Sequence, residues 1–454
     1  MLEELFPTCQ KVIDASEKKG VEAIEIFLSY NKQQQVILNG LSIGTQRAKE
    51  EAGAGIRVLH NNAEGFSYTN NLTFDSLLAT ALEAHSIAQH APKIEGVALA
   101  TVKTVPTVKG TYSQELAELS ADALTKDGLN FLKGFTSIDP RIRTVLSNIT
   151  NIVAERAIIN SNGVKVTTKN SSFQAGLMAV ASDKTRAGGY VFDDAFSRKH
   201  DVDFYSKGIE LGKRAINGLK QEPIKAFDGP IIFEPNAIFN PIAIVLGLTT
   251  SADWRQRGIS FWRDKLADKV AAENFQLIDK PHDLQGGAGV RPFDDEGTPT
   301  NELPIIQDGI LQTFLHNIRT ANKENLKSTG HAMRGLGNQA TFTQKPTNAF
   351  FNSPWILAGD VSKEEMIQET RKGLIIHNYQ GTVRHQNGIF SGVAKGAHLI
   401  ENGEITKPVT GVSISGNVFD LINNIRAIGK EYHLASGFLT TPIIQFDGIR
   451  ISTK

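Results

Sequence analysis

The clearest alternation of apolar and polar residues in this sequence lies between residues 387 and 429. Alternation through residues 393–399, and again through 410–414, predicts two strands, because successive side chains of a strand point to opposite faces. Asn402-Gly403 lies between the two runs and supplies the two-residue turn that is typical of a tight hairpin. The pattern therefore predicts a strand, a hairpin turn and a second strand.

A helix is predicted directly after the second strand. Asn417 can cap its beginning, and Gly429 can end it. The apolar residues between them fall on one stripe at helical spacing: Phe419, Leu421, Ile422, Ile425 and Ile428. We expect this helix to pack back on the two strands.

The first third of the chain has the order helix, strands, helix. An apolar stripe within residues 1–20 predicts the first helix, and Thr73 starts the second. The strands between them are predicted at residues 22–30, 35–38, 54–59 and 65–68, with Asn61-Asn62 as the turn before the last. Residues 1–110 are therefore predicted to form a compact α+β unit.

The middle of the chain follows a similar order, without a sequence repeat that can be aligned. Ser113 can cap a long helix that Gly134 ends, and a further helix is predicted at 205–219. The strands are predicted at 141–147, 152–159, 164–168 and 173–181, with a hairpin turn at 160–163. We predict a second α+β unit at 111–224 and a sheet-rich C-terminal domain at 225–454, which makes the fold class α+β.

Composition and charge narrow the classes of function. Lys plus Arg and Asp plus Glu number 48 each, so the net charge does not attract nucleic acid or anionic membranes. The single cysteine, Cys9, rules out an internal disulfide and a cysteine-rich zinc site. The first residues do not resemble a signal peptide, and no apolar run approaches the roughly 20 residues that span a bilayer. We expect a cytoplasmic protein without a nucleic-acid or membrane partner.

Residues 281–309 form a long loop rich in glycine and proline, which makes it a candidate functional segment. It carries three adjacent carboxylates, Asp294, Asp295 and Glu296, with His282 nearby. These four residues could form a hard-metal or acid/base site, or the acids could hold the loop through turns and salt bridges. Consecutive acids on extended backbone alternate sides, so at most two can converge on one ion, and this favours the structural role.

Histidine spacing does not predict a metal site. The eleven histidines contain no HExxH, no HxH and no pair separated by three or four positions. No G-x-S-x-G nucleophile motif is present either. We therefore expect no metal ligands, no catalytic residues and no cofactor in this chain, and keep His282, Asp294, Asp295 and Glu296 as loop or groove positions.

Three segments together resemble the PmbA/TldE side of the TldD/PmbA family. They are IIFEPNA at 231–237, PFDDEGTPT at 292–300 and IENGEITKPVTGVSISGN at 400–417, of which the last is the most specific. The resemblance covers essentially the whole chain. Members of this family are known as modulators of DNA gyrase and as a heterodimeric metallopeptidase.

The resemblance also includes a departure from the family's peptidase subunit, TldD. That subunit carries an HExxxH helix and a cysteine near its C-terminus, whereas the corresponding places here hold the apolar residues 243–248 and Leu434. The metal ligands and the glutamate that would activate water are absent. The resemblance therefore implies a metal-free, non-catalytic partner of a TldD-like metallopeptidase subunit, which helps to form a groove for unfolded or peptide substrates.

Two other functions stay open. One is an autonomous hydrolase with a non-standard site, built from Asp294, Asp295, His282 and His385. The other is an interaction protein that modulates gyrase or a toxin–antitoxin system. Since both family subunits share a fold, we also expect a homodimer when the chain is alone.

Overall fold

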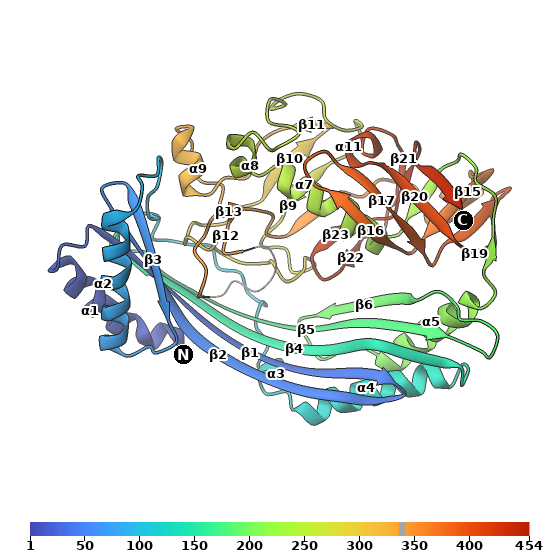
Figure 1. Ribbon diagram of the computed structural model, residues 1–454, viewed down its shortest axis with the longest axis horizontal. Helices are drawn as coiled ribbons and strands as arrows, with labels where there is room; N and C mark the ends of the chain where they lie inside the picture. Colours follow the sequence, from blue (N-terminus) through green and yellow to red (C-terminus); the bar gives the residue numbers. More distant parts are fainter. Residues whose placement is uncertain (336–341, 454) are drawn as a thin grey trace.

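The computed structural model describes residues 1–335 and 342–453. A long curved sheet occupies one side of the molecule, and the C-terminal part lies over the concave face of that sheet (Figure 1). Helices pack on the opposite face. The α+β class predicted from the sequence is confirmed.

The curved sheet has the strand order β3-β2-β1-β4-β5-β6, and all neighbouring strands are antiparallel. Its strands are β1 (Ala23–Gly40), β2 (Ser42–His60), β3 (Ala63–Thr69), β4 (Ile142–Asn160), β5 (Lys165–Ala181) and β6 (Val191–Ser197). Residues 22–30 and 35–38 were predicted as separate strands, but they belong to one strand, β1. The polar residues between them remain in register with both β2 and β4, because a sheet with one wet face accepts polar side chains there.

Helices cover the other face of this sheet at its two ends (Figure 1). They are α1 (Phe6–Glu17) after a short 3₁₀ turn (Leu2–Leu5), α2 (Phe74–His90), α3 (Gln114–Ala117), α4 (Ala121–Thr136) and α5 (Phe204–Gly218). The single long helix predicted after Ser113 is instead two helices, because Ser113 and Ser120 each cap a separate one. Gly134 of α4 and Gly208 of α5 let these two helices approach closely.

The predicted units 1–110 and 111–224 both contribute strands to this one sheet, since β1 pairs with β4 along most of its length. One hydrophobic cluster joins α1 and α2 to β1, β2 and β4, and a second joins α4 and α5 to β1, β4, β5 and β6. Residue 110 lies in the connection between α2 and α3. The two boundaries, at 110 and 224, stay a prediction.

The C-terminal part contains several smaller sheets around one large core. Their orders are β11-β10-β9-β14-β23-β22, β21-β24-β8-β15-β18-β19-β7, β16-β17-β20-β25 and β12-β13. The strands are β7 (Glu222–Pro223), β8 (Ile231–Phe233), β9 (Leu277–Asp279), β10 (Leu303–Gln307), β11 (Ile310–Leu311), β12 (Ala332–Met333), β13 (Asn348–Ala349), β14 (Pro354–Ile356), β15 (Lys372–Ile376), β16 (Asn378–Arg384), β17 (Ile389–Lys395), β18 (His398–Glu401), β19 (Glu404–Thr410), β20 (Val412–Asn417), β21 (Ile425–Ile428), β22 (His433–Ala435), β23 (Leu439–Thr441), β24 (Ile444–Phe446) and β25 (Arg450–Thr453).

Short helices connect these strands. They are α6 (Pro235–Ile238), a π-helical turn (Phe239–Ala243), α7 (Ile244–Thr249), α8 (Ala252–Gln256), α9 (Ile318–Lys323), α10 (Lys363–Gln368) and α11 (Val418–Leu421). No helix in the described ranges is both long enough and apolar enough to cross a membrane.

Asn402-Gly403 makes the predicted hairpin turn, here between β18 and β19, and both residues have positive φ angles, 52° and 83°. The helix predicted after Asn417 is wrong beyond its first turn. Asn417 caps α11 as expected, but α11 ends at Leu421, and Ile425 and Ile428 pair with β24 as strand β21. Both the helix and the strand bury apolar residues at these spacings, and the pairing with a distant strand decides between them.

Candidate functional site

The three adjacent acids of the 281–309 loop lie between the curved sheet and the C-terminal part. Asp294, Asp295 and Glu296 are only 1%, 2% and 1% exposed. Each carboxylate has its own set of partners, so the three do not converge on a common point. The loop is therefore fixed by the interactions of its own buried carboxylates.

Asp294 closes the turn in which it lies. Its Oδ1 accepts hydrogen bonds from the backbone N–H groups of Glu296 and Thr298, both at 2.9 Å. Its Oδ2 accepts from the N–H of Ala332, also at 2.9 Å. These three hydrogen bonds close the turn and tie it to residue 332.

The other two acids face arginines. Asp295 accepts from Arg291 Nη1 at 3.0 Å and lies 3.5 Å from Arg156 Nη1 of β4. Glu296 accepts from Arg57 Nη1 of β2 at 3.2 Å and from the N–H of Ile318 at 2.8 Å. Two loop acids thus bind two arginines of the sheet.

On the curved sheet, Arg57 lies at the centre of these contacts. Its guanidinium is 3.0 Å from Glu25 of β1 and 3.5 Å from Glu64 of β3, in addition to Glu296. Glu25 also accepts from Arg334 Nη2 at 2.9 Å. We call this set the interdomain charge network: Glu25, Arg57, Glu64, Arg156, Arg291, Asp294, Asp295, Glu296 and Arg334.

Burial and neighbouring charges move the pKa values of the loop acids in opposite directions. Burial raises the pKa of Asp294, and the charge of Glu296 adds to that rise, while Arg291 and the N–H donors oppose it. Burial also raises the pKa of Glu296. For Asp295 the effect of burial is overcome by Arg291 and Arg156, which lower the pKa overall.

The two histidines proposed for a hydrolytic site have other surroundings. His282 Nε2 lies 3.1 Å from the Thr300 hydroxyl, and burial lowers the pKa of His282. His385 lies in the hairpin turn between β16 and β17. Within residues 1–335 and 342–453, no group of three His, Cys, Asp or Glu side chains is arranged to hold a metal ion.

The segment that replaces the HExxxH motif lies in the hydrophobic core. Residues 243–248 span the end of the π-helical turn and most of α7, and their buried side chains include Val245 and Leu246, both 0% exposed. A side chain at Gly247 would collide with the ring of Phe350. Leu434 lies on β22 and pairs with Thr440. These positions offer packing contacts and no group that could bind or transfer a proton.

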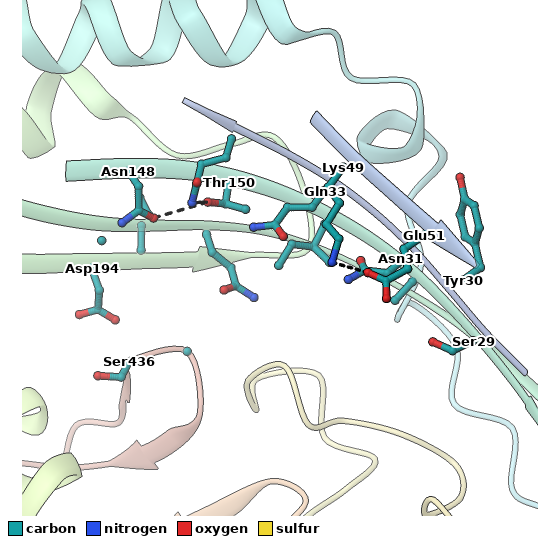
Figure 2. A pocket seen from close by; sticks show the side chains of 18 of the residues that line it. Ser29, Tyr30, Asn31, Gln33, Lys49, Glu51, Asn148, Thr150, Asp194 and Ser436 are labelled. Atoms are coloured by element: carbon teal, nitrogen blue, oxygen red, sulfur yellow. Dashed lines mark hydrogen bonds and ion pairs between the residues drawn. The ribbon is translucent and has the colours of Figure 1, made fainter. Parts of the chain in front are cut away.

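A polar groove of about 480 Å³ lies elsewhere on the concave face. Figure 2 shows Asn31, Gln33, Asn148 and Thr150 on the sheet side of it, with Asp194 and Ser436 at one end. Asp194 belongs to the edge strand β6, and Ser436 belongs to the turn between β22 and β23. The groove therefore has a floor of strands and a wall from the C-terminal part.

The lining of this groove is polar, and it includes the charged side chains of Lys49, Glu51, Asp194 and Arg156, the last of which also belongs to the charge network. Gln35 Nε2 donates to the Thr150 hydroxyl at 3.1 Å, and Lys49 pairs with Glu51. Asn31 Oδ1 is buried and has no hydrogen-bond partner among the described residues. Sequence reasoning missed these positions, although alternate polar residues of β1, at 31, 33 and 35, mark a wet face within a strand.

Comparisons with known proteins agree with this architecture. Models of the PmbA/TldA metallopeptidase family match residues 24–88 as domain 1, 113–219 as the central domain and 228–453 as the C-terminal domain. The chain belongs to the PmbA/TldD family. The resemblance seen in the sequence is confirmed, and residues 231–237, 292–300 and 400–417, which carry it, all lie in the C-terminal match.

Relatives of this PmbA/TldD protein extend over nearly its full length. A metalloprotease from Methanothermobacter thermautotrophicus is 26% identical over 436 residues, which is 92% of this chain and 90% of the relative. Metalloprotease PmbA of Escherichia coli is 25% identical over 414 residues, 87% of this chain and 86% of the relative. The crystal structure of TldE from Thermococcus kodakarensis has the same fold, with a TM-score of 0.89, 23% identity and coverage of 98% of this chain and 100% of that one.

Proposed function

We propose that this PmbA/TldD-family chain is the metal-free, non-catalytic partner subunit of a TldD-type metallopeptidase. In this role it forms part of the groove that receives unfolded or peptide substrates. The observation that carries the proposal is the polar groove of about 480 Å³ on the concave face of the sheet. The apolar, buried segment at 243–248 supports the non-catalytic part of the proposal, because it offers no ligand and no general base.

The chemistry of the groove suits an extended chain of variable sequence. Amide and hydroxyl side chains, such as those of Gln33, Asn148 and Thr150, can hydrogen-bond to peptide groups without selecting a charge. The strand β6 is the last strand of its sheet and runs along the groove. A peptide added to such an edge is bound through its main chain, which tolerates many sequences.

The partner implied by this proposal is a TldD-like subunit that carries HExxxH. Both subunits of such a pair would share one fold and could meet through equivalent surfaces. For the same reason we expect two copies of this chain to pair when the partner is missing. Analytical ultracentrifugation of the chain alone and of the mixture measures both associations.

The test is a peptidase assay on an unfolded substrate, with elemental analysis of the same samples. The purified chain should be inert and should hold no stoichiometric metal, and activity should appear when an HExxxH-bearing TldD-type subunit is added. A matched control adds that subunit with its HExxxH glutamate changed to glutamine, which should remain inactive.

Two results would contradict the proposal. One is full activity of the HExxxH-bearing subunit when this chain is omitted. The other is stoichiometric zinc in this chain, or cleavage by this chain alone, which would favour an autonomous hydrolase.

A further inference from the structure

A second cavity, of about 240 Å³, lies beyond the end of the polar groove. Val191 and Phe192 of β6 line it, whereas Asp194 and Ala195 of the same strand line the groove. Phe192 and Asp194 are two residues apart on one strand, so they share a face of the sheet. A chain that follows β6 along the groove would therefore reach this cavity within a few residues.

Between the two cavities, Asn236 joins the C-terminal part to β6. Its Nδ2 donates to Asp194 Oδ1 at 2.5 Å, and its Oδ1 accepts from the N–H of Ser436 at 3.2 Å. Asn236 belongs to α6, and Glu234, which immediately precedes that helix, lines the second cavity. The wall of the groove thus continues directly into the wall of the second cavity.

A glutamate and a histidine are paired inside this cavity. Glu234 accepts from His377 Nδ1 and from Lys363 Nζ. Burial would raise the pKa of Glu234, but His377 and Lys363 lower it to about 2, so the carboxylate is ionised at neutral pH. When Nδ1 carries the ring proton and donates it to Glu234, Nε2 of the same ring is a hydrogen-bond acceptor.

The Nε2 atom of His377 lacks a partner. It is buried, and no described residue forms a hydrogen bond with it. A buried acceptor without a partner costs free energy, which a ligand that donates a hydrogen bond would recover. The cavity thus offers a place for an N–H or O–H group.

The cavity also carries positive charge. Arg214 pairs with Asp193, and Lys363 pairs with Glu234, but Lys395 forms no ion pair within the described residues. Lys395 is held beside His377, whose backbone N–H donates to the Lys395 carbonyl at 3.1 Å. The charge that remains without a partner therefore favours an anionic group next to the histidine.

The rest of the lining combines polar side chains, those of Asn217, Gln221, Asn378 and His398, with an apolar part. Tyr190 and Ile405 are 44% and 45% exposed, and both line this cavity, with Ile375 and Pro408. A cavity of about 240 Å³ has room for one amino-acid residue of moderate size. A single leucine residue has about that size.

We propose that this cavity binds the C-terminal residue of a peptide that lies in the polar groove. The free carboxylate pairs with Lys395, the last backbone N–H donates to His377 Nε2, and an apolar side chain contacts Ile405 and its neighbours. This inference rests on the proposed function, because it assumes that the groove receives peptides. It adds the end of the peptide that is recognised and the preferred chemistry of the last residue.

The test measures binding of fluorescent octapeptides that end in leucine to the full purified chain, by fluorescence anisotropy. The peptide with a free carboxylate should bind about tenfold more tightly than the same peptide with a terminal amide, because a charge-assisted hydrogen bond is lost in the amide. Methylation of the last amide nitrogen should weaken binding several-fold. Lys395→Gln should abolish the preference for the free carboxylate, and Lys184→Gln, at an exposed lysine outside both cavities, should retain it.

The remaining outcomes separate this inference from the proposed function. If both octapeptides bind equally well, the proposal that the cavity binds the terminal carboxylate is wrong, and the proposal that the groove binds peptides is retained. If N-acetyl-leucine binds and neither octapeptide does, the cavity is a small-molecule site and the peptide-end assignment is wrong. If no probe binds, the pocket is wrong and the chain alone has no peptide groove, a result independent of the peptidase assay with the partner subunit.

Discussion

The concave face of the curved sheet meets the C-terminal part in two different ways. At the end that carries Arg57, charged side chains are paired, buried and tied to the 281–309 loop. Further along the same strands, amide and hydroxyl side chains line an open groove of about 480 Å³. The sheet and the C-terminal part therefore form a buried contact between charged groups in one place and enclose a polar groove open to solvent in the other.

This difference separates polar residues whose partners lie within the protein from polar residues that face an open groove. Each acid of the interdomain charge network already has its donors, so a ligand would have to displace them. The groove leaves hydrogen-bonding capacity unused, as at Asn31 Oδ1 among the described residues. Three adjacent acids are the more conspicuous feature of the sequence, yet our proposed function assigns peptide binding to the amides of the groove.

The largest effect should follow from breaking the charge network. Arg57→Met removes the partner shared by Glu25, Glu64 and Glu296, and leaves buried carboxylates without compensation. We expect the free energy of unfolding to fall by about 3–5 kcal/mol, measured by chemical denaturation. The control is Arg47→Met at an exposed position of the same strand, which should change it by less than about 0.5 kcal/mol. Equal losses in the two variants would contradict the assigned role of the network.

A smaller effect should follow from Asp294→Asn, and it should depend on pH. Because the folded state raises the pKa of Asp294, its protonated form stabilises the fold at low pH, and this stability is lost as pH rises above the ordinary carboxyl range near 4. Asparagine does not titrate in this range. Between pH 5 and 8, the free energy of unfolding should therefore fall by about 2 kcal/mol less in the variant than in the wild type. Denaturation at several pH values measures this slope, and Asp264→Asn, at an exposed side chain, should keep the wild-type slope. If Asp294→Asn also kept it, Asp294 would be ionised throughout.

Filling the groove should have the smallest effect on stability but should weaken peptide binding selectively. Ala154 lines the groove on β4, whereas Ala48 on β2 is exposed and does not line it. Ala154→Trp should change the free energy of unfolding by less than about 1 kcal/mol but weaken binding of an unfolded peptide about tenfold, or about 1.4 kcal/mol. Ala48→Trp should leave both unchanged. If binding survived in Ala154→Trp, the groove would not be the peptide site.

Local patterns in the sequence were sufficient for many elements. The turn at Asn402-Gly403, the helix α5 and most strands of the sheet follow from turn residues and periodicity. Ile425 and Ile428 were placed in a helix because their spacing suits one, and only the pairing with β24 makes them a strand. Long-range pairing therefore limits prediction even where the apolar residues are identified correctly.

The sequence predicted less of the candidate site than of the fold. The loop acids were found, and their structural role was favoured, but their arginine partners could not be named. Arg57 and Glu296 are 239 positions apart, and Glu25 and Arg334 are 309 apart. The groove needs strands β1, β4 and β5 side by side, together with the turn at Ser436, and local spacing encodes none of these neighbours. The alternating polar residues of β1 were the one local indication.

The span of the charge network has a consequence for synthesis on the ribosome. All six strands of the curved sheet have been made by Ser197, yet Glu296 and Arg334, which pair with Arg57 and Glu25, follow only 99 and 137 residues later. During that interval, the concave face of the nascent sheet exposes ionised groups together with Phe27, which later lies beneath Arg334. We expect these charges to keep the unfinished face hydrated and to discourage its association with other nascent chains. On this expectation, the residues that stabilise the finished protein also keep the partly synthesised sheet from associating with other chains.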